Sequence, residues 1–202
     1  MSIRALSAAV ALAAGFVMVG CAAEQGGGTL AASAVSAAVL PAKAEPGVVY
    51  LIRGGANIFS TGLDVIAEKL RAKGVDAQSV GYAGWPQLAV KLDNDYRKSP
   101  SNIILIGHSF GANAAVIMTQ EMLKHGTPVE LMILLDPTES QKIPPNVSRV
   151  IYYQSRTATG TGITVTGLFG FRGSIQTIAV KENHLQMDDS VLLQDQTVAA
   201  VL

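Results

Sequence analysis

The sequence contains few of the residues that metal centres and disulfide frameworks require. Cysteine occurs once, as Cys21, and histidine occurs three times in 202 residues. A single thiol cannot form an internal disulfide. Paired cysteines are absent and the histidines stand far apart along the chain, so no metal-ligand cluster is indicated. The Gly-Lys-Ser/Thr motif that cradles phosphates is also missing, and no cofactor is expected.

Charge of one sign is not in excess either. Lysine and arginine number 15, aspartate and glutamate also number 15, and the formal net charge is zero. The sequence has no basic cluster of the kind that nucleic-acid binding uses. The composition therefore gives no support for a nucleic-acid partner.

One long apolar run is present, and it is typical of an export signal. A positively charged start at residues 1–4 precedes an almost uninterrupted apolar run at residues 5–19, followed by Gly20 and Cys21. This order of charged, apolar and small residues is that of a secretory signal. The run is shorter than the roughly 20 residues that a transmembrane helix needs.

The end of the run resembles the lipobox of bacterial lipoproteins, in which the cysteine is acylated and becomes the mature N-terminus. Met18-Val19-Gly20-Cys21 carries the resemblance, with methionine where leucine is usual. It implies lipidation of Cys21 and a membrane-anchored protein of the bacterial cell envelope that faces the periplasm. Ala22 resembles the residue that follows the cysteine in lipoproteins directed to the outer membrane. The alternative is an ordinary signal peptide that is cleaved nearby.

The rest of the chain divides into a tether and one domain. Residues 22–46 are rich in Ala, Gly and Ser and lack aromatic side chains, which favours a flexible tether. Residues 47–202 are enough for one compact domain. In this domain, apolar β-branched runs alternate with helical patterns. Strands are expected at 48–52, 75–82, 102–106, 129–135, 149–154 and 174–180, and helices at 61–74, 85–97, 112–123 and 189–202.

This alternation predicts βαβ units and a largely parallel sheet covered on both faces by helices. Such sheets place their sites at the carboxyl ends of the strands. Thr61 and Asp64 are placed to form a capping box at the start of the first helix.

Gly107-His108-Ser109-Phe110-Gly111 matches the G-x-S-x-G pattern of a nucleophile turn. It lies between the strand 102–106 and the helix 112–123, which is the setting that the pattern requires. A sharp turn would hold Ser109 in a strained conformation. Gly107 and Gly111 would remove Cβ atoms that otherwise collide with the neighbouring strand and helix. The alternative is a glycine-rich turn in which the serine only caps the helix.

With this turn the chain resembles the α/β-hydrolase superfamily, especially its small lipase- and thioesterase-like members. The resemblance covers nearly all of residues 47–202 and implies a three-layer α/β-hydrolase fold with a mostly parallel central sheet. It also implies a serine, an acid and a histidine in that order along the chain. Residues 136–149 leave no room for the large lid that many lipases insert there, so a minimal form of the fold is expected.

His184 is the predicted general base, by position and by exclusion. It follows the last expected strand by four residues, at the edge where the superfamily carries its base. His108 lies inside the turn with its side chain directed away from the serine, and His125 lies near the C-terminal end of a helix, a favourable place for a histidine. A solvated loop histidine is the alternative for His184.

Asp136 is the predicted acid that orients the base. It ends the strand 129–135 and precedes Pro137, which stops that strand. Glu121 lies within a helix and Glu130 begins a strand at the wrong edge. Many relatives carry the acid one strand later, but residues 155–174 contain no carboxylate. A turn-forming Asp-Pro is the alternative reading of this position.

The backbone amides of Phe110 and Gly55 are the expected oxyanion hole. Phe110 directly follows the nucleophile. Arg53-Gly54-Gly55 follows the first strand and resembles the His-Gly-x of lipases and the Arg-Gly-x of cutinases, which assigns the second amide to Gly55, with Ala56 as a neighbouring alternative.

These residues predict a serine hydrolase that cleaves a carboxylic ester or thioester through an acyl-enzyme. An open site for short or medium acyl groups, or for one end of a larger ester, is expected. The segment 160–173, with Leu168, Phe169 and Phe171, would border an acyl pocket or form a flexible loop. The alternatives are an acyltransferase with the same triad and a non-catalytic envelope lipoprotein that uses the fold for binding.

Overall fold

The structure is a computed structural model that describes residues 47–55, 60–156 and 162–202. The signal sequence, the lipobox with Cys21, the tether and Ala56 lie outside the described residues, and their assignments stay predictions. No helix in the described part combines the length and the apolar character needed to cross a bilayer.

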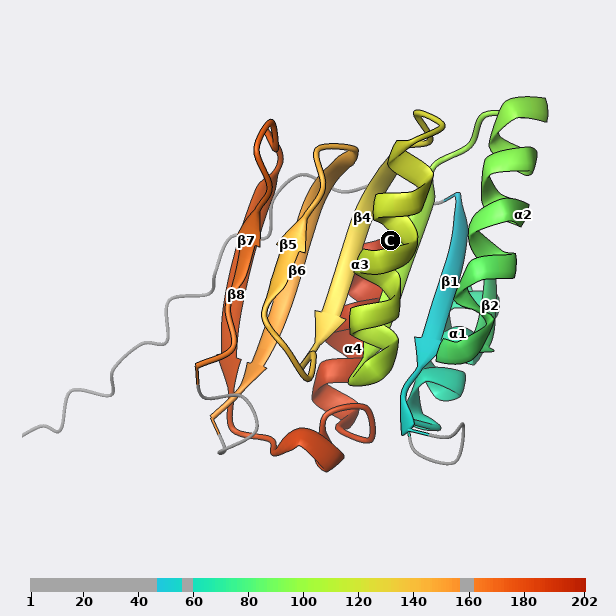
Figure 1. Cartoon of the computed structure of the whole chain (residues 1–202). Coiled ribbons are helices and arrows are strands. Elements are labelled where there is room, and N and C mark those ends of the chain that lie inside the picture. Colours follow the sequence, from blue (N-terminus) through green and yellow to red (C-terminus); the bar gives the residue numbers. More distant parts are fainter. Residues whose placement is uncertain (1–46, 56–59, 157–161) are drawn as a thin grey trace, which may run out of the picture. The chain divides into compact units, whose positions relative to one another are not determined.

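Six parallel strands form the central sheet, in the order β2-β1-β3-β4-β6-β8 (Figure 1). β3 and β4 are buried along almost their whole length, as expected for the middle strands of a sheet covered on both faces. Their bounds and those of the outer strands are β1 Val48–Arg53, β2 Asp76–Gly81, β3 Ile103–His108, β4 Val129–Leu135, β6 Val147–Ser155 and β8 Ser174–Val180.

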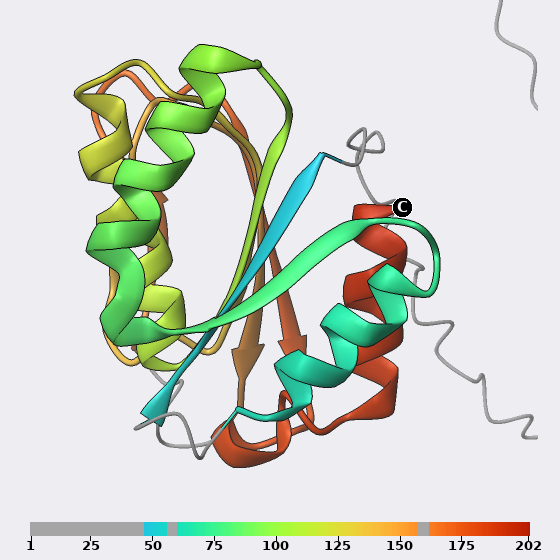
Figure 2. The ribbon, with the colours of Figure 1, turned by 90° about the vertical axis from the view of Figure 1, so that its right-hand side faces the viewer.

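Within the described residues, four α-helices cover the two faces of the sheet (Figure 2). α1 (Gly62–Arg71) and α4 (Val191–Val201) pack on one face, and α2 (Trp85–Lys98) and α3 (Phe110–Leu123) pack on the other. Each face therefore has its own apolar core. The three-layer α/β arrangement with a mostly parallel central sheet, expected from the sequence, is confirmed, and no large lid is inserted among the described residues.

The strand order contains a switch point between β1 and β3. From β1 the chain passes through α1 to the edge strand β2, and it then returns through α2 on the opposite face to β3. The connections that leave β1 and β3 consequently go to different faces of the sheet. In open α/β sheets, ligands bind in the crevice that this divergence opens at the carboxyl ends of the strands. The loop after β1 and the turn after β3 meet there.

Two short strands were not expected. β5 (Gln141–Ile143) and β7 (Val165–Gly167) pair in parallel as a second, two-stranded sheet. Ile143 and Val165 join the core that α2 and α3 form, so this small sheet covers part of the main sheet where no helix is available. The strands are too short to show a periodic apolar pattern.

The segment that follows β7 runs away from the carboxyl edge. The amide of Leu168 donates to the carbonyl of Ile143, Gly170 lies beside Pro145, and Gly173 lies against the backbone of Val147, where β6 begins. Leu168–Phe171 is therefore at the opposite edge of the sheet from the predicted site. The suggestion that these residues border an acyl pocket is wrong.

The expected capping box at the first helix is also absent. Thr61 has helical backbone angles, and its side chain makes no capping hydrogen bond. The carboxylate of Asp64 instead lies 3.0 Å from the guanidinium of Arg53 at the end of β1. The carboxylate of Asp64 therefore forms an ion pair with Arg53 in place of a cap on the Thr61 amide.

Candidate active site

Ser109 stands on a sharp turn between β3 and α3, with φ 58° and ψ −126°. A non-glycine residue rarely adopts this conformation, and it persists only where the surrounding structure enforces it. Here the amide of Ser109 donates to the carbonyl of Leu135, and its carbonyl accepts from the amides of Ala112 and Asn113. These bonds hold the strained residue between β4 and the first turn of α3.

The two glycines of the turn are required by close backbone contacts. A Cβ on Gly107 would lie 2.5 Å from the carbonyl oxygen of Gly111, and a Cβ on Gly111 would collide with the carbonyl of Ile52 in β1. The sequence-based expectation for these glycines is confirmed. The turn, the helix and the end of β1 are packed backbone against backbone.

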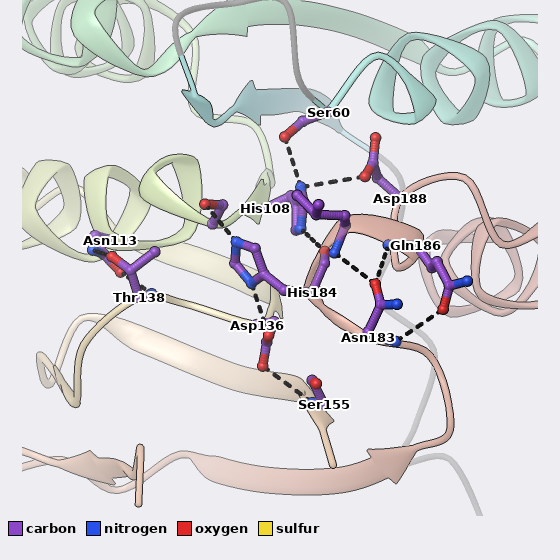
Figure 3. Close-up of polar contacts among 12 residues, drawn as sticks. Ser60, His108, Asn113, Asp136, Thr138, Ser155, Asn183, His184, Gln186 and Asp188 are labelled. Carbon is purple, nitrogen blue, oxygen red and sulfur yellow. Dashed lines mark hydrogen bonds and ion pairs between the residues drawn. The ribbon is translucent and has the colours of Figure 1, made fainter. Parts of the chain in front are cut away.

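The structure brings the predicted serine, histidine and aspartate into one hydrogen-bonded chain, here called the Ser–His–Asp cluster (Figure 3). His184 Nε2 lies 2.9 Å from Ser109 Oγ, and His184 Nδ1 lies 2.8 Å from Asp136 Oδ2. A carboxylate only accepts hydrogen bonds, so Nδ1 carries the ring proton. Nε2 is then the acceptor that faces the serine hydroxyl.

Asp136 is fully buried, and its two carboxylate oxygens have separate partners. Oδ2 accepts from His184, and Oδ1 accepts from the amide of Ser155 at 3.1 Å. Its backbone φ is 43°, again in the left-handed region. The backbone leaves the extended conformation at Asp136, directly after β4, and the carboxylate of this residue faces the histidine.

His184 is presented by a short 3-10 turn, η3 (His184–Gln186), which the sequence analysis missed. Asn183 caps this turn. Its side chain accepts from the amides of Leu185 and Gln186, and the Gln186 side chain accepts from the Asn183 amide in return. The Asn-x-x-Gln spacing is a variant of the capping-box pattern and was available as a signal in the sequence. The cap fixes the backbone that carries the imidazole.

Phe110, one of the two predicted oxyanion-hole residues, directly follows the serine, and Gly54, which precedes the other, lies against it. The Phe110 amide begins α3, and among the described residues it has no hydrogen-bond acceptor. A Cβ on Gly54 would lie 2.8 Å from Ser109 Cβ, so the loop after β1 touches the nucleophile turn. The Gly54 amide itself donates to Ser60 Oγ at 3.3 Å. The next amide, that of Gly55, stays the predicted second donor.

The other two histidines have separate partners. His108 is buried, with its Nε2 2.9 Å from the carbonyl oxygen of His184 and its Nδ1 2.6 Å from Ser60 Oγ. His125 follows α3, at the end of the helix far from Ser109, and its Nδ1 lies 2.6 Å from Asp93 Oδ2. A 14-residue helix is about 21 Å long, so His125 is remote from the serine.

A mostly apolar groove of about 300 Å³ is lined by residues that follow Ser109 and Asp136 in the sequence. The rings of Tyr82 and Phe110 lie 5.7 Å apart along it, and Phe110 is half exposed. Phe110, next to Ser109, and Thr138, two residues after Asp136, both line it. Its other lining residues are Trp85, Asn113, Ala114, Ile117 and Glu139.

No group of three metal-ligating side chains occurs among the described residues.

Comparison with known proteins gave matches among solved structures alone. No protein-family model matches the chain, and no curated protein matches it. The type II thioesterase BorB from the borrelidin biosynthetic cluster is 12% identical, with 80% of this chain and 96% of that chain covered and a TM-score of 0.48. An arylesterase is 11% identical, with coverage of 78% and 75% and a TM-score of 0.47.

A third solved structure is the NocB thioesterase domain from the nocardicin cluster, in covalent complex with a fluorophosphonate nocardicin G analog. It is 14% identical, with 77% of this chain and 92% of that chain covered and a TM-score of 0.47. Likenesses with identities and TM-scores this low add nothing to the geometry of the site.

Proposed function

We propose that the protein is a serine hydrolase that cleaves a carboxylic ester or thioester by way of an acyl-enzyme on Ser109. The observation that carries the proposal is the hydrogen-bonded chain from Ser109 Oγ through the imidazole of His184 to the buried carboxylate of Asp136. Ser109, Asp136 and His184 come from three separate loops, after β3, β4 and β8, at one edge of the sheet. This arrangement serves nucleophilic catalysis, because it lets a neutral hydroxyl lose its proton as it attacks.

In the first half of the reaction, Ser109 Oγ attacks the substrate carbonyl carbon while His184 Nε2 takes the hydroxyl proton. Asp136 keeps the imidazole in the tautomer whose Nε2 is free and stabilises the imidazolium that forms. The imidazolium then gives its proton to the leaving alcohol or thiol as the bond to the carbonyl carbon breaks. The acyl group remains on Ser109.

In the second half, water replaces the leaving group. His184 Nε2 takes a proton from the water as its oxygen attacks the acyl carbonyl, and then returns the proton to Ser109 Oγ when the acid leaves. In both halves negative charge develops on the carbonyl oxygen. The proposed donors that stabilise that charge are the Phe110 amide, at the N-terminus of α3, and the Gly55 amide.

The aromatic groove beside Phe110 is the proposed binding site for the acyl group. Its volume of about 300 Å³ and its mainly apolar lining suit a short or medium acyl chain or an aryl group. Glu139 at the groove disfavours substrates with a second negative charge near the ester. A series of oxygen and thiol esters of increasing chain length should reach its highest kcat/KM within this size range.

Reaction with a fluorophosphonate probe tests the proposal. The full chain should be labelled, Ser109→Ala should not be, and the matched control Ser101→Ala, an exposed serine at the opposite edge, should be labelled as the parent is. Failure of the folded parent protein to react would favour a binding protein. Transfer of the acyl group to an added alcohol in preference to water would make the enzyme an acyltransferase.

We also propose that Cys21 anchors the protein to a bacterial envelope membrane with the domain facing the periplasm. The lipobox-like Met18-Val19-Gly20-Cys21 supports it. Metabolic labelling with a radioactive fatty acid should mark the parent protein in the membrane fraction, and Cys21→Ala should remove the label. Loss of the anchor should leave the reaction with the fluorophosphonate probe unchanged.

A further inference from the structure

His108 connects the two loops that the proposed chemistry depends on. It precedes Ser109 directly, it is only 2% exposed, and both of its ring nitrogens have partners. Nε2 lies 2.9 Å from the carbonyl oxygen of His184, on the loop that carries the base. Nδ1 lies 2.6 Å from Ser60 Oγ (Figure 3). Ser60 Oγ accepts a hydrogen bond from the amide of Gly54, on the loop that carries the proposed second oxyanion amide.

The directions of these hydrogen bonds follow from what each group can donate. A carbonyl oxygen only accepts, so Nε2 of His108 must carry a proton. In the neutral ring Nδ1 is then an acceptor, and the hydroxyl of Ser60 donates to it. The Ser60 oxygen in turn accepts from the Gly54 amide. One neutral imidazole thus satisfies every group in a continuous chain from the loop after β1 to η3.

Burial favours this neutral form. Burial lowers the pKa of His108, and the neighbouring His184, with its ring centroid 5.0 Å away, lowers it further. Asp188 Oδ1, 3.4 Å from Nδ1, the hydrogen bond to the His184 carbonyl, and Asp136 act in the opposite direction and raise the pKa. Burial also raises the pKa of Asp188, which weakens that opposition. A neutral His108 does not repel the imidazolium that His184 becomes during the reaction.

We propose that His108 is a positioning residue that holds the base loop and the oxyanion loop in register around Ser109. The inference rests on the proposed function. Ser60 shares this positioning role, because its hydroxyl contacts the His108 ring. Its φ of 75° lies in the left-handed region, as do those of Ser109 and Asp136. Misplacing a catalytic group by about 1 Å can lower the rate on the order of 100-fold, so fixing both loops to one ring is consequential.

Two substitutions separate the two contacts of the ring. In His108→Gln the side-chain amide reaches the place of Nε2, keeps a donor toward the His184 carbonyl and loses the contact with Ser60. In His108→Asn the amide occupies the place of Nδ1, keeps the contact with Ser60 and loses the one with His184. Ser60→Ala removes the link to Gly54 and leaves the ring intact.

The test measures kcat, KM and their pH profiles on an aryl ester, with thermal unfolding recorded for each variant. His108→Asn should lower kcat by about 10- to 100-fold with KM changed less, and should shift the acidic limb of the kcat/KM profile, because the base loop is released. His108→Gln should restore the parental limb, because it keeps the contact with the base loop, and should lower kcat no more than Ser60→Ala does. Ser60→Ala should lower kcat and leave that limb unchanged, and Ser101→Ala should behave as the parent.

The outcomes also separate this inference from the proposed function. An unreactive parent protein would overturn both. An active parent whose His108→Asn and Ser60→Ala variants keep the parental kcat and pH profile, with only a lower unfolding temperature, would overturn the positioning role alone. If the His108 variants fail to fold, the kcat of Ser60→Ala decides the outcome, because that variant leaves the buried ring in place.

Discussion

The two edges of the sheet handle left-handed backbone differently. At the amino edge, Gly74, Gly126 and Gly170 take positive φ angles, and a Cβ there would meet open space or ordinary contacts. At the carboxyl edge Gly55 also takes a positive φ angle, but so do Ser60, Ser109 and Asp136, each of which has a side chain. The strain of these three residues places a hydroxyl, a carboxylate and a second hydroxyl where chemistry is proposed.

The difference shows that the carboxyl edge is built for positions that side chains must occupy. Glycine would relieve the backbone there, as it does at the amino edge, but it would remove the functional group. Stability and activity should therefore respond in opposite directions at one edge and independently at the other. The experiments below test this contrast from the largest expected effect to the smallest.

The largest effect is expected from Ser109→Gly. Removal of the nucleophile should lower kcat by about 10⁶-fold. Relief of the strained φ should at the same time raise the free energy of unfolding by about 1 kcal/mol, after allowance for the extra freedom of glycine in the unfolded chain. Ester turnover and urea unfolding measure the two quantities. A variant that is both inactive and less stable would contradict the proposed strain.

Asp136→Asn should lower kcat by about 10⁴-fold, because an amide nitrogen facing His184 Nδ1 would favour the wrong tautomer. The amide oxygen can still accept from Ser155, so the fold should survive. Hydrolysis of an aryl ester gives the rate, and unfolding controls for stability. As a control, Asp76→Asn changes an exposed acid at the start of β2 and should leave kcat unchanged.

Gly111→Ala should destabilise the protein by about 3 kcal/mol, because its Cβ would meet the carbonyl of Ile52 in a packed backbone contact. Gly126→Ala, at the other edge, should cost about 1 kcal/mol for its φ of 74° alone and should leave kcat unchanged. Urea unfolding of both variants gives the comparison. Equal losses would show that close packing does not distinguish the nucleophile turn.

The smallest effect concerns pH. Because burial lowers the pKa of His108, the folded state binds that proton more weakly than the unfolded state does. The free energy of unfolding that depends on a neutral His108 is therefore fully present above the unfolded-state pKa of about 6.5. It is lost as the pH falls from that value toward the lower pKa of the folded state. The advantage of the parent protein over His108→Gln in unfolding free energy should therefore shrink between pH 7.5 and pH 5.5. An advantage that grows on acidification would mean that Asp188 holds His108 in its charged form.

The sequence predicted the interior of the fold well, for a physical reason. The expected strands 129–135 and 174–180 coincide with β4 and β8, and every other strand of the main sheet lies within two residues of its expected bounds. Parallel strands buried on both faces are apolar along their length, and turn residues end them sharply. The same strand ends also predicted the positions of the G-x-S-x-G turn, at the end of β3, and of Asp136, directly after β4.

What the sequence did not reveal depends on contacts between distant residues. Ser60 lies 48 positions from His108, and His184 lies 76 positions from it. His108 was expected to play a local part in the turn, and no pattern in the sequence indicates that it joins two loops. Asp64 was assigned to a cap for the same reason, since its proximity to Arg53 exists only once β1 and α1 have packed.

Detection of the acyl-enzyme is the most direct test of the proposal that Ser109 is the nucleophile. The full chain should be mixed with an excess of an aryl ester, quenched within the first turnover and mapped by mass spectrometry of its peptides. One acyl group per chain is expected on Ser109, with a burst of released phenol of the same size, and neither should occur in His184→Ala. Steady turnover with the acyl group on another residue, or turnover by Ser109→Ala at the parental rate, would contradict it.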